Sequence, residues 1–189
     1  MKWHRFLISE SLDSEVVKIS DKELIHQWRS VLRFSVGDKL ILFNNEGKEV
    51  KAEILNLENS YAELQILERL QKEETNLPQV HLYLSLIKQS NFELAVEKAT
   101  EVGVASITPL ITERTVKLGI KRERLERIIK EASEQSSRTS IPILNEPIKL
   151  PEALARAKSL GKIMFFDPSG LSFSSIPSNN LSPITSLFI

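Results

Sequence analysis

The residues with the clearest capacity for chemistry are two arginines that follow apolar segments. Arg138 ends a predicted helix beside Gln135 and Ser136, in a run with little other charge. A planar guanidinium in such a place can hold an anionic ligand through two parallel hydrogen bonds. The alternative is that Arg138 only caps the carbonyls of its own helix. Arg114, at the end of an apolar run, is the second candidate for ligand binding.

A separate basic group is predicted at the N-terminus. Its members are Lys2, His4, Arg5, Arg29 and Arg33. The two later arginines are four residues apart, so a regular helix would place them on one face. Trp3 and Phe6 lie between these charges in the sequence, and aromatic and basic side chains together suit base stacking and phosphate contact. Solvated surface charge remains the alternative interpretation.

The other charges favour a structural role. Between Arg114 and Arg138, six Lys and Arg residues are interleaved with glutamates, a pattern typical of a salt-bridged, solvent-facing helix.

Composition excludes several function classes. The chain has 189 residues, 25 basic and 25 acidic side chains, no cysteine and three scattered histidines. Nucleic-acid binding would therefore depend on local clusters, and thiolate or histidine metal sites are not indicated. GxGxxG and GxxxxGK[ST] signatures are absent, as is HExxH. The sequence shows no signal peptide or membrane-length apolar segment, so we expect a cytoplasmic protein with no metal and no membrane contact.

The first part of the chain, residues 1–70, has the two-residue alternation of short strands. An NNEG turn at 44–47 predicts a hairpin. One helix interrupts the strands: Ser20 and Glu23 have capping-box spacing, and an apolar stripe follows at Leu24, Trp28, Val31 and Leu32. These features predict a small β-barrel with one packed helix. The charged segment 71–78 is the expected linker.

The second part, residues 79–189, alternates strands with helices. Strands are predicted at 80–87, 105–111, 162–166 and 184–189, and helices at 91–102, 121–137 and 151–160. Ser90 and Glu93 predict a capping box for the first helix, and Gly103 its end. This order predicts an α/β domain with a mostly parallel sheet. Ligands of such sheets bind at the carboxyl ends of the strands, where Thr112, Glu113 and Arg114 follow an apolar run.

Several motifs together resemble one family. They are HRF at 4–6, VLR…GD at 31–38, ELAVEKATEVGV…ITPLITERT at 93–115 and EASEQSSRTSIP at 131–142. In these four motifs the chain resembles the bacterial ribosomal RNA small-subunit methyltransferase E family, which makes N3-methyluridine in 16S rRNA. The resemblance implies a two-domain α+β protein with an N-terminal PUA-like RNA-binding barrel and a C-terminal SPOUT domain, a knotted Rossmann-like α/β fold. It also implies S-adenosylmethionine as methyl donor, the small ribosomal subunit as partner, and a homodimer.

Roles for individual residues follow. Within the basic N-terminal group, His4, Arg5, Arg29 and Arg33 are the expected RNA contacts. By resemblance to the family's strand-end loop, Phe166, Asp167 and Pro168 would contact the cofactor, with Ile189 as a further cofactor residue. Removal of the N3 proton of uridine leaves an anion, which a cation beside the base would stabilise. Arg138 is the first candidate for that role and Arg114 the second, with phosphate binding as the alternative for both. Glu101 and Glu113 are weaker candidates for a base.

The sequence departs from the family pattern at one place. A glycine-rich GPEGG loop, a further strand, a second cofactor loop and a closing helix follow the family's equivalent of 184–189, and this sequence ends at Ile189. We therefore expect an incomplete cofactor pocket, and a chain that is itself inactive. The alternatives are a non-catalytic RNA-binding or dimerisation module, and a SPOUT methyltransferase with a different target.

Overall fold

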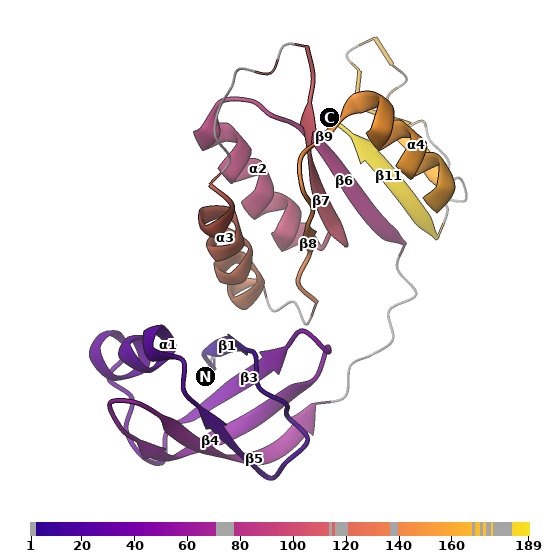
Figure 1. Ribbon diagram of the computed structural model, residues 1–189. Helices are drawn as coiled ribbons and strands as arrows, with labels where there is room; N and C mark the ends of the chain where they lie inside the picture. The colour runs from indigo at the N-terminus through magenta and orange to yellow at the C-terminus, as the bar shows by residue number, and fades with distance from the viewer. Residues whose placement is uncertain are drawn as a thin grey trace. The chain divides into compact units, whose positions relative to one another are not determined.

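The chain folds into two compact units, Met1–Glu74 and Thr75–Ile189. The computed structural model describes residues 3–70, 78–113, 115, 121–136, 140–167, 169–170, 172, 175 and 183–189. Each unit has its own sheet (Figure 1). The buried apolar residues form one cluster in the first unit and two clusters, one on each face of the sheet, in the second.

The first unit is built on a five-stranded sheet in the order β1-β3-β4-β5-β2. Its strands are β1 (Arg5–Ile8), β2 (Val16–Ile19), β3 (Lys39–Asn44), β4 (Glu49–Leu57) and β5 (Ala62–Leu70). Strand β1 runs parallel to β3 and the other pairs are antiparallel. Alternate residues of β4, Val50, Ala52 and Ile54, are buried, as the sequence alternation predicts.

The predicted hairpin turn is confirmed between β3 and β4. The Asn44 side chain accepts hydrogen bonds from the backbone N–H groups of Glu46 and Lys48, at 3.1 and 3.2 Å. Gly47 has a φ of 76°, which a residue without Cβ adopts readily. Local turn chemistry therefore fixes the register of the two strands.

The N-cap of the first helix lies one residue later in the chain than the sequence predicts. The N-cap of α1 (Lys22–His26) is Asp21 and not Ser20, because the Asp21 carboxylate accepts from the N–H groups of Glu23 and Leu24 at 2.9 and 3.1 Å. The capping box predicted at Ser20 is therefore wrong. Two neighbouring residues could both cap a helix, and the spacing alone did not separate them.

The helix continues as a π-helical turn, η1 (Gln27–Val31), which the sequence did not predict. A π turn holds more residues than an α turn, so residues four apart no longer share a face. Trp28 is fully buried, as predicted, but Val31 is 67% exposed. Arg33 lies beyond η1 with a φ of 56°. Arg29 and Arg33 therefore do not lie on one regular helix face, and that prediction is wrong.

The second unit contains a parallel sheet in the order β10-β11-β6-β7-β8, with a short β9 also paired to β7. The strands are β6 (Gln79–Ser85), β7 (Ser106–Ile111), β8 (Ile143–Leu144), β9 (Ile148–Lys149), β10 (Lys162–Phe165) and β11 (Ile184–Phe188). All pairs are parallel, which confirms the predicted sheet. The two-residue strands β8 and β9 were not predicted, since so short a segment carries no periodicity.

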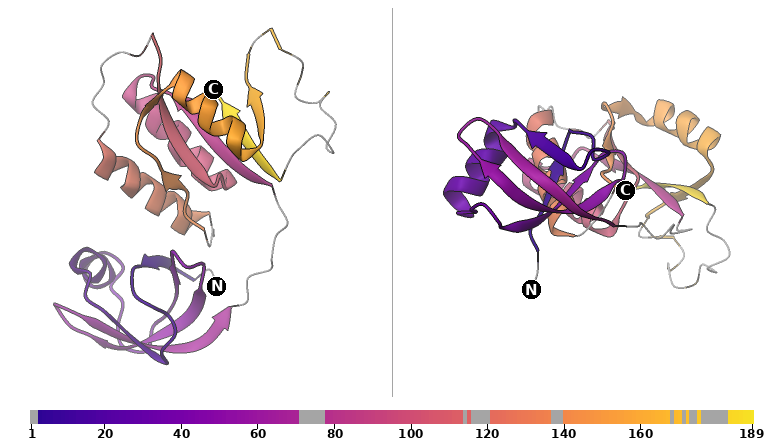
Figure 2. Two further views of the ribbon diagram at one scale, coloured as in Figure 1. Left: turned by 45° about the vertical axis from the view of Figure 1, so that its right-hand side comes forward. Right: turned by 90° about the horizontal axis from the view of Figure 1, so that it is seen from below.

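Helices cover both faces of this sheet, as Figures 1 and 2 show. On one face lie α2 (Gln89–Val102) and α3 (Arg122–Gln135), whose buried residues pack over Leu82, Leu84 and Ile107. On the other lies α4 (Leu150–Leu160), whose Ala153 and Ala157 are fully buried against Tyr83 and Phe188. The predicted helices and strands of this unit are confirmed to within two residues.

Glycines follow the last residues of α2 and α4, and the predicted N-terminal capping box of α2 is wrong. Gly103 ends α2 in the left-handed region, with a φ of 89°, as predicted. Gly161 follows α4 where a Cβ atom would lie 2.4 Å from the carbonyl oxygen of Ile184, so only glycine fits. The capping box of Ser90 and Glu93 does not form, because α2 begins at Gln89 with Lys88 as its N-cap and no side-chain cap.

Candidate functional site

The candidate site lies at the carboxyl-end edge of the parallel sheet. Because β6, β7, β10 and β11 all run in the same direction, the residues that follow them meet at this edge. Open α/β sheets bind ligands there, where loops leave the strands and helix N-termini point outward. The structure thus brings residues that are far apart in sequence to one edge.

Three of the predicted cofactor residues lie here, and two are joined to neighbouring strands by backbone hydrogen bonds. The Phe166 N–H donates to the carbonyl of Phe188, and the Ile189 N–H donates to the carbonyl of Tyr83, each at 3.0 Å. Asp167 follows Phe166 directly. Phe166 and Ile189 are therefore placed by adjacent strands, which fixes their backbone positions.

Ser85 at the end of β6 is a site residue that the sequence did not single out. Its hydroxyl and its backbone N–H both donate to the carbonyl of Ile189, at 3.0 and 2.9 Å. The available signal was one polar residue inside the apolar run predicted at 80–87. Ser85 thus links the end of β6 to the residue after β11.

An aromatic stack supports this edge from within. The buried Phe188 ring stacks on Tyr83 at 4.5 Å between centroids and on Phe165 at 4.8 Å. Outside the stack, Phe166 and Ile189 are 51% and 52% exposed. The edge therefore offers apolar surface to a ligand on a rigid base.

Asp167 provides a negative charge beside that apolar surface. Its Oδ1 accepts hydrogen bonds from the Ser169 hydroxyl and, at 2.8 Å, from the Ser169 backbone N–H. These two bonds hold the pKa of the Asp167 carboxyl below its ordinary value, and the bond from the Ser169 hydroxyl has the larger effect. Asp167 is therefore ionised at neutral pH, and its Oδ2 has no hydrogen bond to the described residues.

A cavity of about 670 Å³ opens beside β7 on the same edge. It is lined by Ile111, Thr112, Glu113, Lys149, Leu150 and Pro151. Polar groups at the end of β7 were predicted, and the structure confirms Thr112 and Glu113 there. The backbone N–H of Thr112 donates to the hydroxyl of Thr115 at 2.8 Å, which orders the start of the loop.

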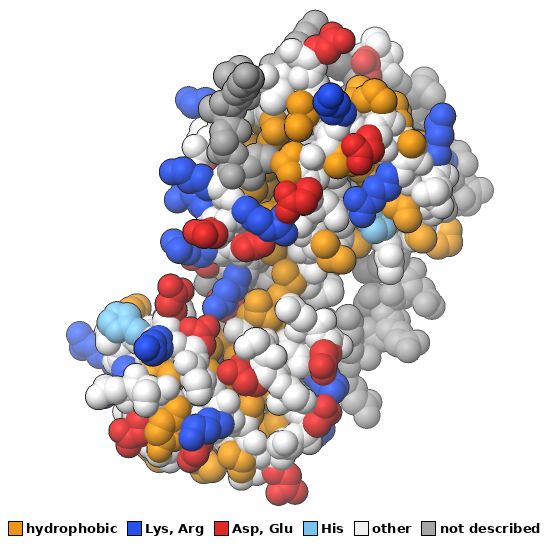
Figure 3. Space-filling view, viewed as in Figure 1, with side chains coloured by type: hydrophobic (Ala, Val, Ile, Leu, Met, Phe, Trp, Pro, Cys, Tyr) orange, Lys and Arg blue, Asp and Glu red, His pale blue; other side chains and the backbone are white. Residues whose placement is uncertain are grey.

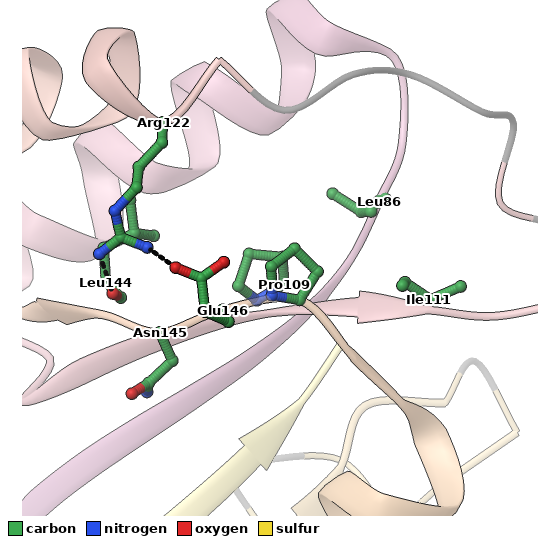
Figure 4. A pocket seen from close by; sticks show the side chains of 8 residues that line it. Leu86, Pro109, Ile111, Arg122, Leu144, Asn145 and Glu146 are labelled. Atoms are coloured by element: carbon green, nitrogen blue, oxygen red, sulfur yellow. Dashed lines mark hydrogen bonds and ion pairs between the residues drawn. The ribbon is translucent and has the colours of Figure 1, made fainter.

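A second cavity, of about 330 Å³, lies between the sheet and the start of α3 (Figure 4). Its walls include Leu86, Pro109 and Ile111, and Arg122 and Glu146 face each other at its rim. The Arg122 guanidinium bonds Glu146 at 2.5 Å, Glu126 at 2.8 Å and the Leu144 carbonyl at 2.9 Å. Arg122 thus holds the segment after β8 against α3 and is not an unpaired cation.

The helix α3 confirms the predicted salt-bridged face in part. Besides the Arg122 contacts, Arg124 bonds Glu93 of α2 at 2.6 and 2.8 Å. This bond and a second from Gln89 hold the pKa of Glu93 at about 2. The charges of α3 therefore tie it to its neighbours.

Three predicted site residues, Arg114, Arg138 and Pro168, lie outside the described residues. Among the candidate bases, Glu101 bonds Lys98 at 2.8 Å in the last turn of α2. That turn lies at the opposite, amino-end edge of the sheet, since α2 starts at the carboxyl-end edge. The structure thus removes Glu101 as a base and leaves Glu113 at the site.

The predicted RNA-contact residues of the first unit fall into two groups. His4, Arg29 and Arg33 are exposed. Arg5 is not, because its side chain is only 7% exposed and bonds Glu49 at 2.7 Å, with the guanidinium 4.6 Å from the centre of the Phe43 ring. Arg5 is therefore not the free surface cation that the sequence predicted, since a glutamate of β4, two strands away in the sheet, neutralises it.

The described residues contain no group of three His, Asp or Glu side chains that could hold a metal ion. Within the same residues, no helix combines the length and the apolar character needed to cross a membrane.

Comparison with known proteins relates both units to RNA-modifying enzymes. The family model for the RNA methyltransferase domain matches residues 73–187, more than half of the chain. The model for the RNA methyltransferase PUA domain matches residues 29–67. These matches agree with the two-domain α+β fold, a PUA-like domain followed by a parallel-sheet α/β domain.

Individual relatives point the same way. The chain is 31% identical over 161 residues to ribosomal RNA small subunit methyltransferase E of Rickettsia conorii, covering 85% of this chain and 66% of that protein. It is 32% identical over 151 residues to the protein of that name from Synechocystis, covering 78% of this chain and 48% of that protein. The chain thus spans about half to two thirds of the length of these relatives.

Solved structures share the fold. One is ribosomal RNA small subunit methyltransferase E from Neisseria gonorrhoeae bound to S-adenosyl methionine, with 26% identity and a TM-score of 0.84 over 100% of this chain and 79% of that chain. Another, from Legionella pneumophila, was solved in complex with the bound cofactor SAM. It has 28% identity and a TM-score of 0.84, over 100% of this chain and 80% of that chain.

Proposed function

The chain belongs to the RNA methyltransferase domain family, and from this premise we propose that the protein that carries this sequence transfers a methyl group from S-adenosylmethionine to N3 of a uridine in 16S rRNA. The observation that carries the proposal is the carboxyl-end edge of the parallel sheet, where an exposed apolar surface adjoins an ionised carboxylate. The named relatives act on small-subunit rRNA and two similar structures bind the donor.

The residues at this edge fit the chemical groups of the donor. S-adenosylmethionine presents a flat purine, two ribose hydroxyls and a charged amino-acid tail, and when bound it supplies a methyl group activated by a sulfonium. The exposed Phe166 and Ile189 side chains suit the purine faces. The Oδ2 of Asp167, to which no described residue donates a hydrogen bond, suits a ribose hydroxyl. In the proposal these three residues, together with Pro168, hold the donor.

The reaction requires the N3 proton of uridine to leave and the resulting anion to be stabilised. We assign stabilisation of that anion to Arg138, with Arg114 as the second candidate. Both follow segments of the sheet unit that the structure describes, Arg114 after β7 and Arg138 after α3. Glu113, at the cavity beside β7, is the candidate acceptor of the proton.

The remaining parts of the proposal concern the partners. His4, Arg29 and Arg33 of the PUA-like unit are proposed to contact RNA, and Arg5 is proposed to hold β1 in place for them. The small ribosomal subunit, in the cytoplasm, is the proposed location of the substrate. A homodimer is part of the proposal because the resemblance to the family implies one.

The donor site is tested by calorimetry with S-adenosylmethionine on wild type and on Asp167→Asn. Asparagine can still accept the hydrogen bonds of Ser169, so the turn stays, while the charge is lost. Loss of one charged hydrogen-bond acceptor should weaken binding roughly tenfold to a hundredfold. Glu152→Gln, an exposed carboxylate in the first turn of α4, is the matched control and should bind normally. Equal affinities for all three proteins would remove Asp167 from the donor site.

A further inference from the structure

The segment from Gln27 to Phe34 has an unusual backbone. In the π-helical turn η1 the Leu32 N–H donates to the Gln27 carbonyl at 2.9 Å, and the Phe34 N–H donates to the Trp28 carbonyl at 2.8 Å. Arg33 adopts a φ of 56°, and among the described residues it is the one non-glycine with positive φ. A single π turn costs stability, and so does a non-glycine residue with positive φ. Both features occur often at functional sites.

A cluster of aromatic rings, which includes Trp28 and Phe34 of this segment, extends from the core to the surface. Phe6 and Trp28 are buried, with ring centroids 5.3 Å apart. Phe34 is half-buried, and its ring centroid lies 6.1 Å from that of Phe6. His4 is exposed, and its ring lies 5.6 Å from Phe34 and 6.3 Å from Phe6. The exposed imidazole of His4 is therefore supported from below by rings that are themselves fixed in the core.

The segment 29–36, which contains Phe34, also carries cations and exposed apolar side chains. Arg29 and Arg33 are exposed, and neither has an ion pair within the part of the chain that the structure describes. Val31 and Val36 are 67% and 66% exposed. Figure 3 shows basic, acidic and hydrophobic side chains intermixed over the unit that contains α1. The nearby carboxylate of Asp38 is occupied, since it accepts from the Ser35 N–H at 2.7 Å.

We propose that His4, Phe34 and Arg33 form a stacking site for one unpaired nucleotide of the RNA substrate. The base stacks on the exposed face of the His4 ring and meets Phe34 at its edge, because those two rings lie at 66° to each other, and Arg33, assisted by Arg29, holds the adjacent phosphate. An aromatic surface of this size accepts a single base and is sequence-tolerant, because every base has a π face. Bases inside a duplex are stacked on one another, so the site selects single-stranded RNA. This inference rests on the proposed function in that RNA is the substrate.

The backbone of Arg33 gives the proposal a distinctive test. Glycine adopts positive φ without steric cost, so Arg33→Gly should hold or raise the thermal stability of the chain. It removes the guanidinium, so it should also weaken RNA binding. A residue kept for stability alone would lose nothing in RNA binding when replaced by glycine.

The experiment measures fluorescence anisotropy of a labelled single-stranded oligouridylate with the 189-residue chain, without donor. His4→Ala should weaken binding roughly fivefold to a hundredfold, the effect of losing one stacking ring. His26→Ala is the matched control, because His26 is exposed and, among the described residues, its ring bonds Ser30 and no other side chain; the affinity of this variant should be that of wild type. Arg33→Gly should weaken binding and reduce the slope of log affinity against log salt by about one. A duplex of the same length should bind more weakly than the single strand.

Several outcomes would overturn the inference. They are absence of RNA binding by the wild type, equal affinity of His4→Ala and His26→Ala, an unchanged salt slope for Arg33→Gly, and a preference for duplex. None of them bears on the methyl donor, which calorimetry tests separately. Normal donor binding with an unaffected His4→Ala would therefore remove the stacking site and leave the proposed methyl transfer in place.

Discussion

The Glu93 carboxylate of α2 accepts two hydrogen bonds from the Arg124 guanidinium of α3, at 2.6 and 2.8 Å. Since the two residues are 31 positions apart, this pair ties together the two helices on one face of the parallel sheet. The hydrogen bond from Arg124 is the main reason that the pKa of Glu93 falls from 4.5 to about 2.

The lowered pKa of Glu93 predicts a pH dependence of stability. A carboxyl with a depressed pKa in the folded state stabilises the fold fully above its unfolded pKa, and this contribution is lost as pH falls from about 4.5 toward about 2. Glu93→Gln should therefore lower the thermal midpoint by a few degrees at neutral pH, and the difference from wild type should shrink toward pH 2. Thermal melts across this pH range measure it.

A double-mutant cycle supplies the control. In an Arg124→Ala background, Glu93→Gln should have little further effect at neutral pH, since the partner is already gone. A full and pH-independent loss in both backgrounds would show that Glu93 acts through packing and not through the ion pair.

Arg5 should matter for folding of the first unit more than for RNA contact. Its guanidinium and the Glu49 carboxylate are 7% and 15% exposed, and removing one partner leaves the other charge poorly solvated. Arg5→Ala should cost about 3 kcal/mol of unfolding free energy, the low end of the range for breaking buried pairs, because Glu49 keeps some solvent contact. Arg29→Ala, on an exposed residue, should cost less than about 0.5 kcal/mol. Urea unfolding of both variants checks this, and similar values for the two would contradict the assignment.

The sequence predicted the parts of the fold that depend on local patterns. Phe92, Val96 and Ala99 recur on one face of α2, and Gly103 can end that helix, so both the helix and its end followed from spacing. The two capping errors have different causes. Asp21 prevailed over its neighbour Ser20 for the same backbone donors. At α2 the helix begins at Gln89, before the predicted cap, and Glu93 pairs with Arg124.

The parts that failed depend on contacts across the chain or on backbone irregularity. The Arg5–Glu49 pair joins residues 44 apart, and no local pattern distinguishes a paired arginine from a free one. The π turn of η1 shifts every later residue around the axis, which moved Val31 and Arg33 off the predicted face. The edge that gathers Phe166, Asp167 and Ile189 could be predicted because parallel strands end together. The role of Ser85 there required the register of β6 and β11.

Gly161 should tolerate no side chain. A Cβ atom there would lie 2.4 Å from the Ile184 carbonyl oxygen, which belongs to backbone at the start of β11 and cannot rotate away. Gly161→Ala should cost about 1–3 kcal/mol of stability through overpacking. Gly37→Ala is a useful comparison, because nothing lies within 4 Å of its Cβ position and only its φ of 92° opposes the change. Denaturant unfolding with an unchanged midpoint for Gly161→Ala would contradict the close approach.

Arg138 is predicted to act in turnover and not in folding. In the protein that carries this sequence, Arg138→Ala should lower the rate of RNA methylation roughly tenfold to a thousandfold, the scale of losing one electrostatic stabiliser. Its thermal midpoint should stay within a few degrees of wild type. Single-turnover methyl transfer and thermal melts measure the two effects. A large drop in stability with near-normal rate would assign Arg138 to capping of its helix.

The most direct test of the central claim is the chemical identity of the product. The protein that carries this sequence is expressed in a bacterial strain whose 16S rRNA lacks N3-methyluridine, and the nucleosides of purified small subunits are analysed by mass spectrometry. The proposal predicts that N3-methyluridine appears in 16S rRNA with the wild type and falls sharply with Arg138→Ala. Expression of folded protein that leaves 16S rRNA without N3-methyluridine would contradict it.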